Sequence, residues 1–187
     1  MDEAVDTPSA ILSSAALLLR QRTFEDISYL ELAEIADVSE RTIYRRFPTR
    51  SHLLEALGRW IEAEHFPVAE FRTGAEFREV VRLRLRAYEA EPAYAFVAAR
   101  GAALSPIGGE SAGPLTDAIV AMLESAAPDL NRRDAQRVTA TLRYFASALF
   151  WARMRTGFEM SADEAFDVFD LAADRILPVA VKAKRTA

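Results

Sequence analysis

The stretch SYLELAEIADVSERTIYRRF, residues 28–47, decides the fold of this 187-residue chain. Leu32 and Ala36 lie one helical turn apart, which predicts a short amphipathic helix with a small residue facing its neighbour. Asp37 follows at the position where a left-handed backbone is usual, and Ser39 can cap a second helix. Two short helices joined by such a turn form a helix-turn-helix, whose second helix enters the major groove of DNA.

The segment from Val38 to Trp60 is locally basic, with five arginines and two glutamates in a chain whose formal net charge is −5. For DNA binding the distribution of charge matters more than its sum, so this segment favours contact with a phosphate backbone. Arg41 and Arg45 are the candidates near base edges, while hydroxyls among the arginines suit phosphates. The full set of expected DNA contacts is Ser28, Ser39, Arg41, Thr42, Tyr44, Arg45, Arg46, Thr49 and Arg50.

The rest of the sequence is helical in pattern, because strand signals such as Asn-Gly turns and alternating β-branched runs are absent. Helices are expected over residues 9–21, 29–36, 40–46, 50–65, 76–90, 93–103, 114–126, 132–156 and 162–182. Four of the seven glycines fall between Gly101 and Pro114, which predicts a long loop there. We therefore expect an all-α fold of about nine helices.

Composition argues against several classes of site. Without cysteine there can be no disulfide, zinc-thiolate site or cysteine nucleophile. The sequence has no run of 18 uncharged apolar residues and begins with acidic residues, so we expect a cytoplasmic protein without membrane contact. His52 and His65 are the only histidines, and neither has a catalytic partner at a mechanistic spacing. We expect no enzyme activity, no cofactor and no metal.

Two charged stripes occur at helical spacing in the C-terminal half. We interpret both as solvated faces, with a divalent-metal site as the less favoured alternative for the acidic one. The acidic stripe is Asp163, Asp167, Asp170 and Asp174, and the basic stripe is Arg78, Arg82 and Arg86.

The N-terminal segment resembles the DNA-binding signature of the TetR family of transcriptional regulators over about residues 9–57. The matching residues are Ile11-Leu12, Ala15-Ala16 and Leu19, then Leu32-Ala33, Asp37-Val38-Ser39, Thr42-Ile43-Tyr44-Arg45-Arg46-Phe47, Pro48-Thr49-Arg50 and Leu53-Leu54. Asp37 stands where the family has glycine, Thr23 replaces a glycine after the first helix, and Arg50 replaces a lysine.

The resemblance implies two domains: a helix-turn-helix DNA-binding domain in residues 1–57, and a helical ligand-binding and dimerisation domain in residues 58–187. It implies a homodimer that binds a palindromic operator in double-stranded DNA, as a repressor released by a small-molecule effector. In the family the last two expected helices pair with their copies. The candidate interface residues are Phe145, Leu149, Phe166 and Phe169.

The effector is expected to be hydrophobic or aromatic, because residues 60–156 are rich in aromatic side chains. The candidate contacts are Tyr88, Tyr94, Tyr144 and Trp151. The expected helix over 132–156 has two apolar faces, and the sequence leaves open which of them meets a second copy.

The sequence also allows two alternatives to a TetR-like regulator. One is a small helical enzyme or ligand-binding protein that retains a degenerate helix-turn-helix, and the intact hydroxyl and arginine set from Thr42 to Phe47 argues against it. The other is a helix-turn-helix of a different family, such as a sigma-like module, which the long apolar C-terminal helices disfavour. The operator, the inducer and the choice between repressor and activator stay open.

Overall fold

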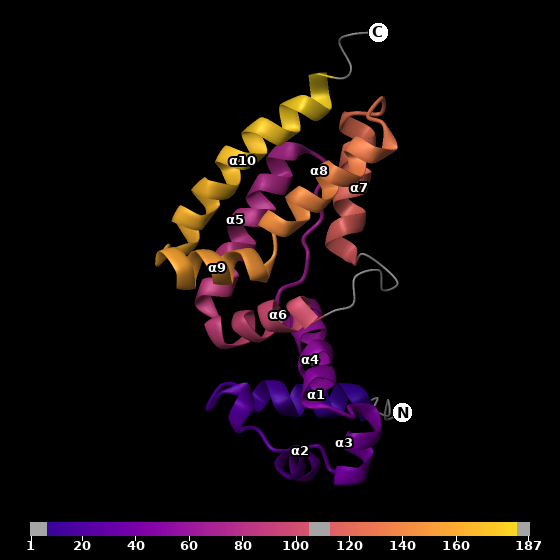
Figure 1. The fold of residues 1–187 in the computed structure, drawn as a ribbon, viewed down its shortest axis with the longest axis vertical. Helices are drawn as coiled ribbons and strands as arrows, with labels where there is room; N and C mark the ends of the chain where they lie inside the picture. The colour runs from indigo at the N-terminus through magenta and orange to yellow at the C-terminus, as the bar shows by residue number, and fades with distance from the viewer. Residues whose placement is uncertain (1–6, 105–112, 183–187) are drawn as a thin grey trace. The chain divides into compact units, whose positions relative to one another are not determined.

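The computed structural model describes residues 7–104 and 113–182, and in these ranges it contains helices and no strand. Figure 1 shows their arrangement. The elements are α1 (Thr7–Leu18), the 3₁₀ turn η1 (Phe24–Asp26), α2 (Tyr29–Ile35), α3 (Glu40–Arg46), α4 (Arg50–His65), α5 (Gly74–Ala90), α6 (Pro92–Leu104), α7 (Pro114–Ala126), α8 (Arg132–Phe145), α9 (Ala148–Phe158) and α10 (Ala162–Lys182). The all-α prediction is confirmed. Within the described ranges, no helix has the length and apolar character needed to cross a bilayer.

The expected single helix over residues 132–156 is wrong, because the chain breaks it into α8 and α9. Ser147 adopts an extended backbone, and its hydroxyl accepts a hydrogen bond from the Phe150 amide at 3.2 Å. A serine that caps a new helix in this way offers the backbone an alternative to continuing the old one. The apolar periodicity runs across the break, so periodicity alone did not reveal it. Of the predicted loop, residues 101–104 are helical and residues 105–112 lie outside the described residues.

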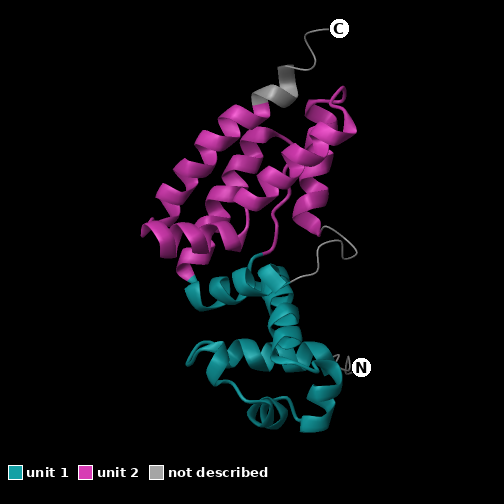
Figure 2. Cartoon of the chain, in the orientation of Figure 1, with its two compact units in different colours: residues 1–66, 91–105 teal, residues 67–90, 106–187 magenta. Residues whose placement is uncertain are grey.

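The chain forms two compact units, drawn in different colours in Figure 2. Unit 1 comprises residues 1–66 and 91–105, and unit 2 comprises residues 67–90 and 106–187. Helix α6 thus belongs to the same unit as the helix-turn-helix. The functional boundary expected after residue 57 stays a prediction.

The core of unit 1 contains a close crossing of helices α4 and α6. A Cβ atom added to Gly101 would lie 2.8 Å from the Leu54 carbonyl oxygen and 3.0 Å from the Gly58 Cα. A Cβ atom on Gly58 would lie 3.0 Å from the Gly101 Cα. The two backbones approach this closely only because both positions lack a side chain.

In unit 2, helix α10 lies alongside α5 (Figure 1) and the two share an aromatic core. The rings of Phe77 on α5 and Phe169 on α10 pack edge to face with centroids 5.7 Å apart, and both side chains are fully buried. Tyr88, Phe150 and Trp151 are likewise buried in this unit. Burial of these large rings contributes to the apolar stabilisation of unit 2.

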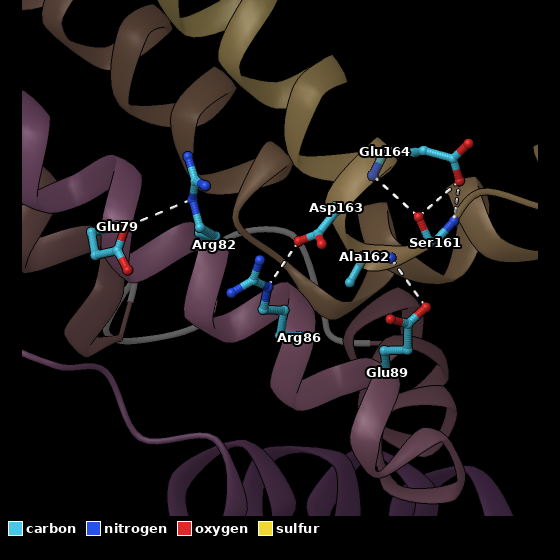
Figure 3. Close-up of polar contacts among 8 residues, drawn as sticks. All are labelled: Glu79, Arg82, Arg86, Glu89, Ser161, Ala162, Asp163 and Glu164. Atoms are coloured by element: carbon cyan, nitrogen blue, oxygen red, sulfur yellow. Dashed lines mark hydrogen bonds and ion pairs between the residues drawn. The ribbon is translucent and has the colours of Figure 1, made fainter.

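Ion pairs between α5 and α10 join parts of the two charged stripes. Arg86 donates to the Asp163 carboxylate at 2.8 Å (Figure 3), and this hydrogen bond lowers the pKa of Asp163. Arg78 donates to both Asp170 and Asp174. None of these side chains is buried, which agrees with solvated faces, and the structure adds the ion pairs that join the two stripes. In the described residues no three His, Asp or Glu side chains are grouped to hold a metal ion.

The start of α10 is fixed by a reciprocal cap that Figure 3 also shows. The Glu164 amide donates to the Ser161 hydroxyl at 3.3 Å, and the Ser161 amide donates to the Glu164 carboxylate at 2.8 Å. Ser161 and Glu164 thus form a capping box. The Ala162 amide also donates to the carboxylate of Glu89 on α5, which anchors the end of α10 to its neighbour.

Candidate nucleic-acid interface

The helix-turn-helix forms from α2, a tight turn and α3, and each boundary has a local cause. The Ser28 hydroxyl caps α2 by accepting from the Glu31 amide, and the Ser39 hydroxyl caps α3 by accepting from the Thr42 amide. Asp37 has a φ of 52°, the left-handed conformation expected at this position. The local chemistry of residues 28–47 is therefore sufficient to specify the motif.

Helix α3 is held in place by one buried face. Ile43 is fully buried and Phe47 is buried at the end of the helix. The Tyr29 hydroxyl donates to the Phe47 carbonyl at 2.9 Å, and the Tyr29 ring packs edge to face on Tyr44 at 4.7 Å. Burial raises the pKa of Tyr29, so this hydroxyl remains a hydrogen-bond donor at neutral pH. The opposite face of α3 is thereby fixed toward the surface.

The exposed face of α3 carries four of the nine residues expected to contact DNA. Its exposed side chains are Glu40, Arg41, Tyr44, Arg45 and Arg46. An open depression of about 550 Å³ lies between α2, α3 and the start of α4. It is lined by Ser28, Tyr44, Thr49 and Arg50 among the expected contacts, whereas Arg41, Arg45 and Arg46 lie outside it. The depression, with the hydroxyls of Ser28, Tyr44 and Thr49, is therefore distinct from the part of the α3 surface that carries the three arginines.

Thr49 caps α4 by accepting from the His52 amide at 3.3 Å. The Thr49 hydroxyl also lies 2.8 Å from Nδ1 of the His52 ring. His65, at the other end of α4, packs against the rings of Trp60 and Tyr94. These contacts give both histidines a structural role in unit 1.

Arg50 is used within unit 1, in a role that the sequence analysis missed. Its guanidinium donates to the carbonyl oxygens of Phe24 and Ile27 and lies 4.3 Å from the centre of the Phe24 ring. It therefore ties the segment before α2 to the first turn of α4. The phosphate contact expected for Arg50 stays a prediction.

We expect Arg50→Ala to lower the free energy of unfolding by about 1–3 kcal/mol, because hydrogen bonds to a charged group are lost and two carbonyls lose their donors. Arg50→Lys is expected to recover only part of this loss, since an ammonium cannot reproduce the planar fork. Urea denaturation followed by circular dichroism measures the effect. Arg46→Ala, at an exposed site on α3, is the control and should change stability by less than about 0.5 kcal/mol. Equal urea midpoints for Arg50→Ala and Arg46→Ala would contradict the structural role of Arg50.

Helix α6 contacts the segment between α1 and α2 through two polar pairs. Arg100 forms an ion pair with Glu25 at 2.5 Å, and this bond lowers the pKa of Glu25. Arg20, just after α1, donates to the Tyr94 hydroxyl at 3.1 Å. Both pairs link α6 to the segment that precedes α2, and Arg100 and Glu25 also line a second depression of about 310 Å³.

The four expected effector contacts do not form one cluster. Tyr88 and Trp151 are buried together in unit 2 with ring centroids 6.0 Å apart. Tyr94 belongs to unit 1, and Tyr144 is 46% exposed on α8. The sequence analysis missed Arg84, which is buried beside Tyr88 on α5. Helical spacing could have identified Arg84 as buried, because position 84 falls on the same face of α5 as the buried residues 77, 81 and 88.

The four expected dimer residues lie at unequal depths in the monomer. Phe166 and Phe169 are buried inside unit 2, and Phe145 and Leu149 are half-buried. Leu149 lies on α9 and Phe145 ends α8. Their role between copies stays a prediction. Among the described side chains of α8 and α10, the exposed large apolar ones are instead Tyr144 and Leu171.

Comparisons with known proteins agree with this fold. Residues 11–57 match the family model of the bacterial regulatory proteins of the tetR family. A TetR transcriptional regulator from Rhodococcus sp. RHA1 superposes with a TM-score of 0.64 and 20% identity, over 91% of this chain and 96% of that one. A TetR variant from Acinetobacter baumannii AYE, in complex with minocycline, gives a TM-score of 0.62 and 14% identity, over 98% and 99%. No curated protein sequence matches the chain. The resemblance to the TetR family is confirmed.

Proposed function

Because the chain has a TetR-family helix-turn-helix in residues 11–57 and the TetR fold along its length, we propose that it is a sequence-specific DNA-binding transcriptional regulator. The observation that carries the proposal is the geometry of α3. Ile43 is fully buried and fixes the helix, while Arg41, Arg45 and Arg46 stay exposed on its outer side. A rigid helix that presents arginines suits readout in the major groove.

Different residues of this surface are expected to contact bases and phosphates, because their side chains differ in chemistry. Arg41 and Arg45 have the bidentate donors that suit the O6 and N7 atoms of guanine. The Ser28 and Thr49 hydroxyls line the adjoining depression near helix N-termini, which favours phosphate contacts. Contacts between arginines and phosphates release counterions, so we expect affinity to fall steeply as salt rises. Glu25 and Glu40 also line that depression and should weaken phosphate binding there by repulsion.

We propose that a second copy binds through the outer faces of α8 and α10. Leu171 and Tyr144 are exposed apolar residues on these helices, and neighbouring charges are complementary between them. Arg133 and Arg137 are exposed on α8, and Glu164 and Asp167 on α10. A two-fold arrangement of α8 against a partner's α10 would bring opposite charges together. Such a dimer would place two α3 helices on half-sites about 34–36 Å apart.

We further propose that a hydrophobic or aromatic ligand binds in unit 2 and releases DNA, which would make the chain a repressor. Support comes from the buried pair Tyr88 and Trp151, and from the minocycline bound to one similar structure. A ligand that prefers the non-binding conformation about 100-fold shifts the equilibrium by about 2.7 kcal/mol. As a regulator of transcription it would act in the cytoplasm of a bacterium, where the DNA is.

Selection of bound sequences from random DNA tests the proposal, and we expect an enriched inverted repeat. Arg45→Ala should weaken binding to the recovered site by about 10- to 100-fold and relax preference at one base position. Arg59→Ala is the matched control, since Arg59 is exposed on α4 and paired with Glu55. Recovery of no repeat by a folded protein would refute the proposal and favour a ligand-binding protein or enzyme with a degenerate motif.

A further inference from the structure

Glu40, the first residue of α3, is the acid of a helix whose other charged residues are arginines. Its side chain is exposed, as are those of Arg41, Arg45 and Arg46. A carboxylate on this surface repels the phosphates of a duplex and so opposes the attraction that the arginines provide. Attraction to a phosphate backbone therefore does not account for an acid at this position.

The local structure of α3 also gives Glu40 no partner. The helix is capped by Ser39, whose hydroxyl accepts from the Thr42 amide at 3.2 Å and lies 2.9 Å from the Thr42 hydroxyl. The residues three and four positions after Glu40 are Ile43 and Tyr44, so no arginine stands where an ion pair along a helix forms. In the ranges that the structure describes, Glu40 takes part in no hydrogen bond or ion pair.

Three other acids of unit 1 show the contrast, because each pairs with an arginine. The pairs are Glu25 with Arg100, Glu31 with Arg22, and Glu55 with Arg59. An acid in the first turn also interacts favourably with the helix dipole, but that interaction affects stability and has no dependence on a DNA sequence. The unpaired carboxylate on α3 is thus available to a hydrogen-bond donor outside the chain.

The position of Glu40 suits contact with a base. In a helix-turn-helix the N-terminal residues of the second helix are those that contact base edges. The Cα–Cβ bond of a helical residue tilts toward the helix N-terminus, which directs Glu40 toward that end of α3. Glu40 also lines the depression of about 550 Å³ together with Tyr44, one turn later. Its carboxylate is therefore at the end of α3 that approaches the bases.

We propose that Glu40 is a specificity-determining residue that reads one cytosine in each half-site of the operator. The inference rests on the proposed DNA-binding function. In the major groove the N4 amino group of cytosine donates to a carboxylate. Guanine and thymine present acceptors there, and adenine has the N7 acceptor beside its N6 donor, so a carboxylate without a proton to donate favours cytosine. Repulsion from phosphates weakens binding to every sequence, whereas this hydrogen bond forms only at the matching base.

Selection of bound sequences from random DNA, with the full chain and its variants, tests the inference. We expect the unaltered chain to recover a C·G pair at one position of each half-site. Glu40→Ala should lose the preference at that position alone, and Glu40→Gln should shift it to adenine, because glutamine pairs with adenine N6 and N7. Glu34→Gln removes the same charge at an exposed site on α2, and as the matched control it should leave every preference unchanged.

Titration of the recovered operator gives the size of the effect. Replacing the C·G pair of one half-site by T·A should weaken binding by the unaltered chain about tenfold, and binding by Glu40→Ala by less than about twofold. Urea denaturation separates the alternative role. An acid that acts only on the helix dipole would lower the urea midpoint of Glu40→Ala and leave its base preference in place, which would refute the inference.

The inference is also overturned if Glu40→Ala loses preference evenly across the half-site, or if Glu40→Gln still selects cytosine. Because Glu40 is exposed, both variants are expected to fold, and circular dichroism checks this. An inverted repeat whose base preferences are the same for every Glu40 variant refutes this inference alone. A folded, unaltered chain that recovers no repeat refutes the proposed function as well.

Discussion

Replacing Gly101 with alanine is expected to lower the free energy of unfolding by about 2–3 kcal/mol, as overpacking of a tight core does. The new Cβ atom would lie 2.8 Å from the Leu54 carbonyl oxygen and 3.0 Å from the Gly58 Cα. Both neighbours are backbone atoms, so no flexible side chain can turn aside to make room. Relief requires α4 and α6 to move apart, which loosens the unit that carries the helix-turn-helix.

Gly157→Ala is the matched control for this prediction, because the same change is made inside another helix. A Cβ atom on Gly157 meets nothing within 4 Å. The higher helix propensity of alanine should therefore raise stability by about 0.5–1 kcal/mol. Urea denaturation of the two variants should give midpoints shifted in opposite directions. If Gly101→Ala were stabilising like the control, the close crossing of α4 and α6 would be wrong.

The DNA-reading motif could be predicted from the sequence because its determinants are local. Ser39 and Thr49 each lie three residues before the backbone amide that they cap. Asp37 lies in the turn whose backbone conformation it favours. Such short-range chemistry is independent of the rest of the fold. The boundaries of α3 and α4 were therefore predicted to the residue.

Contacts between distant segments could not be predicted in the same way. Arg50 suits a phosphate by its position, yet it donates to carbonyls more than 20 residues away. The stripes that contain Arg86 and Asp163 each have the pattern of a solvated helix, and only the packing of α5 on α10 pairs them. Periodicity shows that a helix face is polar or apolar, but it does not identify the opposing surface.

The break between α8 and α9 also changes which side chains are available to a second copy. The expected helix over 132–156 placed Phe145 and Leu149 on one stripe, and the cap at Ser147 separates them. The exposed face of α8 then ends near Tyr144, and the helices α8 and α10 are in contact. A dimer surface proposed from the structure therefore centres on Leu171, which is 66% exposed.

Leu171→Arg is expected to convert the proposed dimer to a monomer and to weaken operator binding by about 10²- to 10⁴-fold. The first effect arises because an unpaired charge would be buried in the apolar centre of the interface. The second arises because two half-sites bound by one dimer share a high effective concentration, which separate monomers lose. Analytical ultracentrifugation and titration of an inverted repeat measure the two effects, and a single half-site should be bound as before.

Phe158→Arg provides the control, because Phe158 is also 66% exposed but lies at the end of α9, outside the proposed surface. It should stay dimeric and bind the inverted repeat normally. Because Leu171 is exposed in the monomer, its replacement should leave the fold intact, so loss of DNA binding cannot be attributed to unfolding. A Leu171→Arg protein that stays dimeric would exclude this face of α10. If Phe158→Arg alone gave monomers, the interface would have to include the end of α9.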